Sequence, residues 1–202
     1  MIVLITGPSG AGKSSFIARL MAADARLAFS VSSTTRPRRK GETDGRDYDF
    51  VGPAEFDALL NEGAFVEWAE VHGNRYGTRR SRLDEMTAAG SIPVLDIDVQ
   101  GGVQVLDLFT TGLVSVFLFP PSWEELERRL RSRATDDDAV IATRLRNARV
   151  EIGYADRYDY WLVNDDLDRA VGRMQAIIQA EECRREAYAQ PPLAARDTDP
   201  SG

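Results

Sequence analysis

The stretch GPSGAGKSS, residues 7–15, decides the fold. It follows a short apolar run, IVLIT at 2–6, and leads into a segment with apolar residues at helical spacing. Its glycines, lysine and serine have the spacing G-x-x-x-x-G-K-[ST] of a phosphate-binding loop, or P-loop, which joins a strand to a helix. Backbone N–H groups of such a loop point at phosphate oxygens, so we expect residues 7–15 to bind a nucleoside triphosphate.

Two side chains of this loop have specific expected roles. Lys13 is expected to reach the terminal phosphates, and the hydroxyl of Ser14 is expected to bind Mg²⁺ directly. Asp96 and Asp98 lie at the end of a later apolar run, and we expect them to contact the same Mg²⁺ through water. A glycine turn that merely starts a helix would require neither the lysine nor the serine.

Composition narrows the class of protein. The 202 residues suit one domain, and the net charge of −7 argues against a general nucleic-acid binder, which needs a basic face. No apolar run approaches the roughly 18 residues that a membrane helix needs, and the first residues lack the features of a secretory signal. A single cysteine excludes an internal disulfide. We therefore expect a cytoplasmic protein with neither a nucleic acid nor a membrane as partner.

Apolar patterns and turn residues predict alternating strands and helices. Strands are expected at 2–6, 27–31, 65–70, 75–76, 92–98, 114–119 and 158–165. Helices are expected at 13–23, 53–63, 79–89, 123–131, 138–152 and 167–189. This alternation predicts an α/β fold, in which helices cover both faces of a parallel sheet. Ligands bind at the carboxyl ends of the strands in such a sheet, and the side chains expected to converge there with the P-loop are Asp96, Asp98, Asn164 and Asp165.

A polar segment after the second strand has the chemistry of an anion site. SSTTRPRRKGETDGRDYDF, residues 32–50, supplies arginines, hydroxyls and a tyrosine in one loop. Guanidinium groups match phosphate oxygens in pairs, so this loop is expected to bind a second phosphate. Glu67 in FVEW and Thr78 in YGT follow it. A carboxylate accepts two hydrogen bonds from the N1–H and the amine of guanine, a pattern that adenine lacks, so the two features together describe GMP.

Taken together, these stretches resemble the guanylate kinases. The resemblance rests on GPSGAGKSS, SVSSTTRPRRKGETDGRDYDF, FVEWAEVHGNRYGT, LDIDVQG, PPSWEELERRLRSR, RLRNA and VNDDL, which cover about residues 2–170 in the family's order. It implies an enzyme that converts ATP and GMP into ADP and GDP, with a P-loop NTPase-type core, a small α+β GMP-binding lobe and a helical lid. The division it implies is one domain over 1–190, with the core at 1–31, 91–131 and 153–190, the GMP-binding lobe at 32–90 and the lid at 132–152. Residues 191–202 are expected to form a disordered tail.

The resemblance also implies roles for individual residues. The ATP-binding residues would be Gly7, Pro8, Ser9, Gly10, Ala11, Gly12, Lys13, Ser14, Ser15, Arg129 and Asn164. The GMP-binding residues would be Ser32, Arg36, Arg39, Glu42, Tyr48, Glu67, Tyr76, Thr78 and Asp98, and the catalytic residues Lys13, Arg36, Arg133 and Arg144. The motif RPRR departs from the family, which usually has a proline where this chain has Arg38. We assign the second phosphate contact to Arg39 through the KGE that follows, and Arg38 is the alternative.

Two other functions compete with this interpretation. A kinase for a different acceptor, such as another nucleoside monophosphate or a phosphorylated sugar, would not require Ser32, Glu67 and Thr78 together. A catalytically inactive guanylate-kinase-like interaction module typically has a degraded P-loop, whereas Lys13 and Ser14 are both present. We therefore expect a monomeric or homodimeric enzyme that uses ATP and GMP with Mg²⁺. Such an enzyme acts by aligning two phosphates and neutralising their charge.

Overall fold

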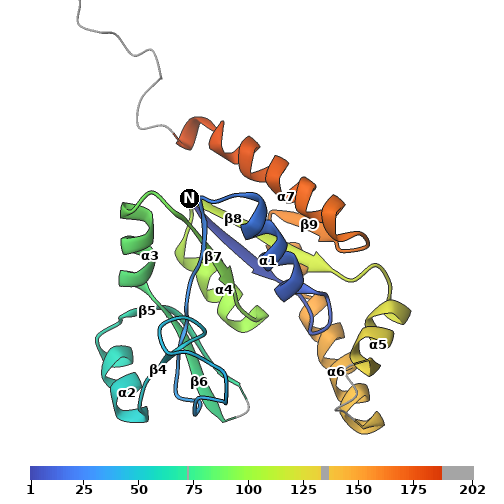
Figure 1. Ribbon diagram of the computed structural model, residues 1–202, viewed down its shortest axis with the longest axis horizontal. Coiled ribbons are helices and arrows are strands. Elements are labelled where there is room, and N and C mark those ends of the chain that lie inside the picture. Colours follow the sequence, from blue (N-terminus) through green and yellow to red (C-terminus); the bar gives the residue numbers. More distant parts are fainter. Residues whose placement is uncertain (72, 133–136, 188–202) are drawn as a thin grey trace, which may run out of the picture.

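A five-stranded parallel sheet forms the centre of the protein (Figure 1). The computed structural model describes residues 1–71, 73–132 and 137–187. In sheet order the strands are β2 (Leu27–Phe29), β7 (Ile92–Asp96), β1 (Ile2–Thr6), β8 (Leu113–Phe119) and β9 (Tyr160–Val163). Every neighbouring pair in this sheet is parallel, which confirms the predicted α/β fold.

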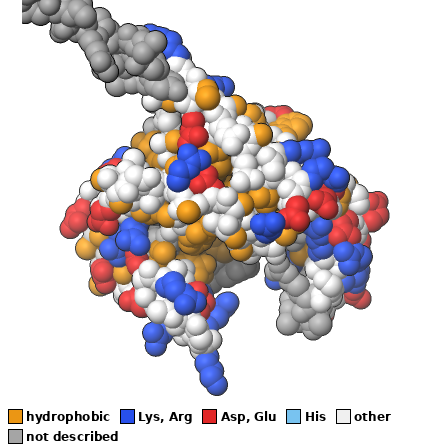
Figure 2. Space-filling model, turned by 45° about the horizontal axis from the view of Figure 1, so that its top comes forward, with side chains coloured by type: hydrophobic (Ala, Val, Ile, Leu, Met, Phe, Trp, Pro, Cys, Tyr) orange, Lys and Arg blue, Asp and Glu red, His pale blue; other side chains and the backbone are white. Residues whose placement is uncertain are grey.

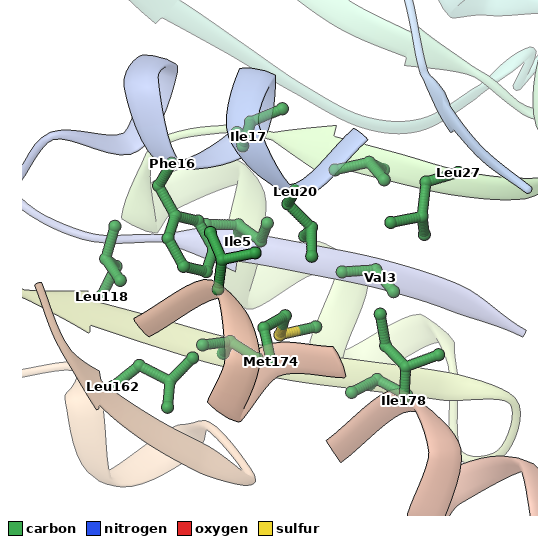
Figure 3. Close-up of a cluster of buried hydrophobic side chains, with 14 of the residues drawn as sticks. Val3, Ile5, Phe16, Ile17, Leu20, Leu27, Leu118, Leu162, Met174 and Ile178 are labelled. Carbon is green, nitrogen blue, oxygen red and sulfur yellow. The ribbon is translucent and has the colours of Figure 1, made fainter. Parts of the chain in front are cut away.

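One face of the sheet is covered by the first and last long helices. Val3 and Ile5 of β1 belong to a buried cluster with side chains of α1 (Lys13–Ala23) and α7 (Leu167–Glu182). Figure 3 shows this cluster, in which both helices pack their apolar sides onto β1. The apolar stripe of α1 therefore anchors the helix that follows the P-loop.

The opposite face is covered by two helices from the middle of the chain. Ile2 and Leu4 of β1 belong to a second buried cluster, with side chains from α3 (Arg80–Ala88) and α4 (Val99–Leu108). Successive residues of β1 point to opposite faces and all five are buried, so the strand is covered on both sides. This burial explains why the run at 2–6 shows no alternation of polar and apolar residues.

A second sheet of four strands forms between β2 and α3, in the order β4-β3-β6-β5 (Figure 1). Its elements are β3 (Ser33–Thr34), β4 (Asp49–Phe50), α2 (Pro53–Asn61), β5 (Phe65–Val71) and β6 (Asn74–Arg79). β5 and β6 form an antiparallel hairpin with a register irregularity between Phe65 and Glu67. We call the region around this sheet, residues 32–79, the second-sheet lobe.

Two helices, α5 (Trp123–Arg131) and α6 (Asp138–Ile152), follow β8 and have the predicted bounds. Ser122 is the N-cap of α5, because its hydroxyl accepts a hydrogen bond from the backbone N–H of Glu125 at 3.2 Å. A single 3₁₀ turn, η1 (Ala155–Arg157), then leads into β9. In Figure 2 the molecule is hollowed between the second-sheet lobe, at the lower left, and the region of α5 and α6, at the lower right.

Several element boundaries differ from the sequence expectation. The expected strands 27–31, 65–70, 75–76, 92–98, 114–119 and 158–165 are found at 27–29, 65–71, 74–79, 92–96, 113–119 and 160–163. The expected helices 53–63, 79–89 and 167–189 are found at 53–61, 80–88 and 167–182, the last followed by the 3₁₀ turn η2 (Arg185–Ala187). An apolar pattern locates an element, but its ends depend on strand partners and capping groups that lie elsewhere in the chain.

Among the described residues, helix α4 is the one larger element that the sequence patterns did not indicate. Gly101 and Gly102 lie in its first half and lower its intrinsic helix propensity. The segment 32–50, expected to be an irregular loop, also contains the short strands β3 and β4. Arg133 and the expected tail 191–202 lie outside the described residues. Among the helices that are described, none is long and apolar enough to span a membrane.

Candidate active site

The P-loop has a backbone geometry that requires glycine. Gly12, which precedes α1, has a φ of 93° and a ψ of 22°. A Cβ atom on Gly12 would lie 2.5 Å from the side-chain nitrogen of Asn164, so a larger residue at position 12 would push the Asn164 side chain away from the loop. Lys13 donates a hydrogen bond from Nζ to the carbonyl oxygen of Gly7 at 2.6 Å. The ammonium group therefore lies within the loop, where the terminal phosphates are expected.

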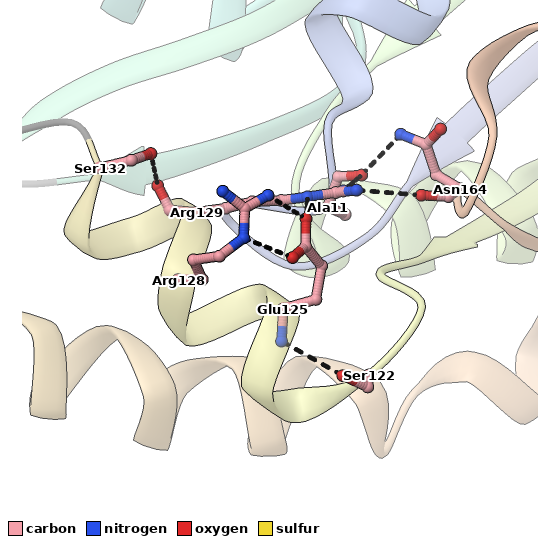
Figure 4. A network of polar contacts seen from close by, with 7 residues as sticks. All are labelled: Ala11, Ser122, Glu125, Arg128, Arg129, Ser132 and Asn164. Carbon is pink, nitrogen blue, oxygen red and sulfur yellow. Dashed lines mark hydrogen bonds and ion pairs between the residues drawn. The ribbon is translucent and has the colours of Figure 1, made fainter.

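Asn164 and Arg129 hold the middle of the P-loop (Figure 4). The side-chain nitrogen of Asn164 donates to the carbonyl oxygen of Ala11 at 2.9 Å, and Arg129 donates to the same oxygen at 3.2 Å. Arg129 also donates to the carbonyl oxygen of Asn164 at 3.2 Å and to Glu125 at 2.7 Å. These contacts join the loop to the end of β9 and to α5. Asp165 does not join them, because it forms an exposed ion pair with Arg169 at 2.8 Å.

A cavity of about 230 Å³ opens at the P-loop. Its lining residues are Pro8, Ser9, Gly10, Gly12, Lys13, Ser14, Ser15 and Asp96. Burial raises the pKa of Asp96, and the nearby Lys13 opposes this shift. Within the described residues, no group of three or more His, Cys, Asp or Glu side chains could hold a metal ion alone. One hydroxyl and one carboxylate beside a phosphate site instead suit Mg²⁺, which usually keeps water and substrate phosphates as ligands.

Asp98 caps helix α4. Its Oδ1 accepts hydrogen bonds from the backbone N–H groups of Gln100 and Gly101 at 2.9 and 3.0 Å. Capping satisfies N–H groups that have no partner within the helix, so Asp98 has a structural role that the motif LDIDVQG did not reveal. Its contact with GMP or Mg²⁺ stays a prediction.

Arg36 is held by a carboxylate and two aromatic rings of the second-sheet lobe. Its Nη2 donates to Oε1 of Glu42 at 2.7 Å, and its Nη1 donates to Oε2 at 3.1 Å. The guanidinium carbon lies 5.3 Å from the ring centre of Tyr48 and 5.7 Å from that of Phe50, and the ring centre of Tyr76 lies 5.8 Å from that of Tyr48. Glu42 raises the pKa of Arg36, so the guanidinium is firmly charged. Four of the predicted GMP-binding residues thus form one cluster.

Two further arginines lie beside this cluster. Arg38 and Arg39 are both exposed. Glu42 accepts a hydrogen bond from the backbone N–H of Arg39 at 2.7 Å, which ties the main chain of Arg39 to Arg36. Figure 2 shows Lys and Arg side chains gathered at the lower end of the second-sheet lobe. The choice of Arg39 over Arg38 as the second phosphate ligand stays a prediction from the sequence.

Glu67 and Thr78 form a buried pair on opposite strands of the hairpin. The hydroxyl of Thr78 donates to Oε1 of Glu67 at 2.6 Å, and the two residues are direct partners in the register of β5 and β6. Glu67 is only 4% exposed. Its pKa is raised to about 7, mainly by burial and to a smaller extent by Asp98, while the hydroxyl of Thr78 opposes the shift. Ser32, the third predicted guanine contact, is half-buried immediately before β3.

The raised pKa of Glu67 is expected to make stability depend on pH. In the unfolded chain the carboxyl releases its proton near its usual pKa of 4.5, whereas the folded chain keeps it up to about 7. The folded state therefore binds more protons between these values, and stability falls as pH rises through them. From pH 5 to pH 8 the free energy of unfolding of the wild type should fall by about 2 to 3 kcal/mol relative to Glu67→Gln. Urea unfolding of both proteins at the two pH values measures this difference, and parallel changes in both would contradict it.

The carboxylates Asp96 and Asp98 of the core interact electrostatically with predicted GMP-binding residues of the second-sheet lobe. Burial raises the pKa of Tyr48 in the lobe, and Asp96 at the P-loop cavity raises it further. Asp98 of the core acts on Glu67 of the lobe in the same direction. Such effects fade beyond a screening length of about 8 to 10 Å, so Tyr48 and Glu67 of the lobe lie on the side of the core that carries Asp96 and Asp98.

The structure describes only one of the two arginines of the predicted lid. Arg144 lies on α6 and is half-buried, while Arg133 lies outside the described residues.

A larger cavity, of about 810 Å³, is found at the amino ends of the strands, where Met1, Ile92 and Leu113 line it. None of the predicted site residues lines this cavity, so the site is assigned to the carboxyl ends of the strands.

Comparison with known proteins agrees with this geometry. The family model described as guanylate kinase matches residues 1–181. The chain belongs to the guanylate kinase family. A guanylate kinase of Syntrophotalea carbinolica is 52% identical over 184 residues, which are 91% of this chain and 87% of the relative. A guanylate kinase of Rhizobium meliloti is 47% identical over 92% of this chain and 85% of the relative. The crystal structure of guanylate kinase from Anaplasma phagocytophilum shares 36% identity and a TM-score of 0.72, covering 92% of this chain and 87% of that one.

Two residues of this guanylate kinase family member contact the predicted guanine site although no role was predicted from the sequence for either of them. Gln104 of α4 hydrogen-bonds to the backbone of Trp68 at 2.8 and 3.1 Å, although the two are 36 residues apart. Gly101 of α4 lies so close to Glu67 that a Cβ atom would be 2.3 Å from its Oε2. A local sequence pattern cannot reveal such contacts, because they join segments that only the fold brings together.

Proposed function

We propose that this chain transfers the γ-phosphoryl group of ATP to GMP and releases ADP and GDP. The observation that carries this proposal is the combination of an intact P-loop with a facing lobe that holds a charged Arg36 cluster and a buried Glu67–Thr78 pair. A P-loop alone does not define an acceptor, so the lobe supports GMP in particular. The same features favour an active enzyme over an inactive interaction module.

On the donor side, residues 7–15 bind the phosphates of ATP. The backbone N–H groups of the loop and the dipole of α1 stabilise the phosphate charge, and Lys13 neutralises the group in transfer. Arg129 and Asn164 support this loop by holding the carbonyl oxygen of Ala11. Arg133 and Arg144 act from the lid, where they add positive charge to the same phosphoryl group.

On the acceptor side, the phosphate of GMP binds to the residues that the lobe gathers around one cluster, namely Arg36, Arg39, Tyr48 and Tyr76. Glu42 positions Arg36 through its two hydrogen bonds. Guanine binds to Glu67, with Ser32, Thr78 and Asp98 around it. No general base is needed, because a phosphate monoester with a second pKa of about 6 is already largely ionised at neutral pH.

Mg²⁺ bound with ATP would neutralise charge on the phosphates and help to align them. Ser14 is the side chain proposed to bind it directly, with Asp96 and Asp98 acting through water. Both Ser14 and Asp96 line the P-loop cavity, which supports this assignment. A cytoplasmic location and a monomeric or homodimeric state remain predictions from the sequence.

The proposal is tested by an ADP-release assay with Mg·ATP as donor and GMP, dGMP, AMP, CMP or UMP as acceptor. ADP release is expected with GMP and dGMP, and chromatography should identify GDP or dGDP as the second product. EDTA in excess over Mg²⁺ should abolish the reaction. Equal ADP release without any acceptor would mean that water receives the phosphoryl group, and would contradict the proposal.

A further inference from the structure

Helix α4 contacts the predicted guanine site at two successive residues of β5. Gln104 contacts the backbone of Trp68, and Gly101, one turn earlier on the helix, contacts the side chain of Glu67. Residues three apart on a helix lie on the same side, so one side of α4 makes both contacts. The core helix is thereby attached to the strand that carries the predicted guanine-binding carboxylate.

Gln104 completes the hydrogen bonds of an edge strand. β5 is the last strand of the second sheet, so one side of its backbone has no strand partner there. The side-chain nitrogen of Gln104 donates to the carbonyl oxygen of Trp68 at 2.8 Å, and the backbone N–H of Trp68 donates to its Oε1 at 3.1 Å. The amide thus pairs with Trp68 as a neighbouring strand would. These two bonds determine where the backbone next to Glu67 lies relative to the core.

Gly101 leaves the space that the carboxylate of Glu67 occupies. A Cβ atom at this position would lie 2.3 Å from Oε2 and 3.1 Å from the carboxyl carbon of Glu67. The other oxygen, Oε1, accepts the hydrogen bond from Thr78 at 2.6 Å. The carboxylate is therefore confined between Thr78 on one side and the first turn of α4 on the other.

We propose that Gly101 and Gln104 are positioning residues for guanine recognition, which set the place of the Glu67 carboxylate relative to the base of the acceptor nucleotide. This inference rests on the proposed function, in which Glu67 binds guanine. Neither residue needs to touch a substrate for this role. Substitutions at either position should weaken the use of GMP and leave the use of ATP unchanged, because the side-chain bonds of Gln104 and the close approach of Gly101 are made to β5 and not to the P-loop.

The substitutions are expected to leave the fold intact. Alanine is a better helix former than glycine, so Gly101→Ala favours α4 itself while its methyl group displaces Glu67. Trp68 is 37% exposed, and water can replace the bonds that Gln104→Leu removes from its backbone. Loss of GMP recognition with an unchanged melting temperature would therefore mark a positioning role and not a general loss of structure.

The first experiment compares Gly101→Ala with Gly172→Ala. Gly172 lies on α7, where an added Cβ atom meets no other atom within 4 Å, so it controls for a glycine-to-alanine change in a helix. In the ADP-release assay, Gly101→Ala should raise the KM for GMP by about 10- to 100-fold, the loss that a displacement of about 1 Å produces. The KM for ATP should stay within about twofold of wild type in both variants, and Gly172→Ala should retain the wild-type KM for GMP.

The second experiment asks whether the effect passes through Glu67. Gln104→Leu should raise the KM for GMP by about tenfold, which corresponds to the loss of two modest hydrogen bonds. In a Glu67→Gln background, Gly101→Ala and Gln104→Leu should each change kcat/KM for GMP by less than about twofold, because the carboxylate they position is absent. Full additivity of the losses would show that these residues act independently of Glu67 and would overturn the inference.

The outcomes separate this inference from the proposed function. A wild-type protein that fails to phosphorylate GMP would refute the function itself. A wild-type protein that uses GMP, together with two variants that keep its KM for GMP, would leave the function intact and refute the positioning role. Equal increases in KM for ATP and GMP would also refute it. If Gly101→Ala proves unstable, Gln104→Leu carries the test alone.

Discussion

A Lys13→Ala variant is expected to phosphorylate GMP with a kcat about 10²- to 10³-fold lower than that of the wild type, the loss that follows removal of one preorganised charge-stabilising group. Lys13 lies within the P-loop, where its ammonium donates to the carbonyl oxygen of Gly7. Alanine removes the positive charge that would neutralise the phosphoryl group in transfer, whereas the backbone N–H groups of the loop remain. The ADP-release assay at saturating ATP and GMP measures this loss.

A matched control separates charge removal at the site from charge removal elsewhere. Arg173 is exposed on α7 and lies outside the predicted site, so Arg173→Ala should keep the wild-type kcat. Circular dichroism and thermal unfolding should show that Lys13→Ala is folded, since it buries no new polar group. A folded Lys13→Ala variant with unchanged kcat would refute the role assigned to the P-loop lysine.

Glu67→Gln is expected to lower kcat/KM for GMP by about 10²- to 10³-fold, with little change in the KM for ATP. The glutamine amide keeps one acceptor oxygen but turns an NH₂ group toward the N–H donors of guanine, which leaves polar groups without partners in a buried site. Steady-state kinetics with each substrate varied in turn measures the two effects separately. Thermal unfolding should show that the variant is folded, since the substitution removes a buried carboxyl whose ionisation opposes folding above pH 5.

Glu70→Gln provides the same chemical change on the same strand. Glu70 is exposed on β5, three residues beyond Glu67, and its neutralisation should leave both KM values unchanged. Equal losses for ATP and GMP in Glu67→Gln would mean that the substitution damages the whole site. That result would remove the basis for assigning guanine recognition to Glu67.

The central sheet could be predicted from the sequence because its signals are local. The apolar run 2–6, the P-loop that follows it and the stripe of α1 each lie within a few consecutive residues, and α1 and α6 were predicted with the bounds they have. The same holds for the parallel arrangement, since strands that alternate with helices can pair in few other ways. Candidate site residues that belong to motifs, such as Arg36 and Glu67, could be named for the same reason, and their roles stay predictions.

Features that depend on pairing between distant segments could not be predicted. Helix α4 contains two glycines that weaken its local signal, and it is stabilised by the cap from Asp98 and by burial of Val99 and Val105. The support that Arg129 gives to Ala11 joins residues 118 positions apart. Gln104 likewise acts on Trp68 across 36 positions. These contacts are set by packing of the finished fold, which no local pattern of residue types encodes.

The assignment of GMP as the acceptor is tested most directly by the ratio of kcat/KM for GMP to kcat/KM for AMP in the wild-type protein, measured at pH 8 with Mg·ATP as donor. This pH lies above the Glu67 pKa of about 7, so the carboxylate is charged and accepts hydrogen bonds only. Guanine supplies two donors to it, whereas adenine presents a lone pair at N1. We predict a ratio of at least about 10², as expected for a buried site built to hydrogen-bond one base. Comparable values for GMP and AMP would contradict it.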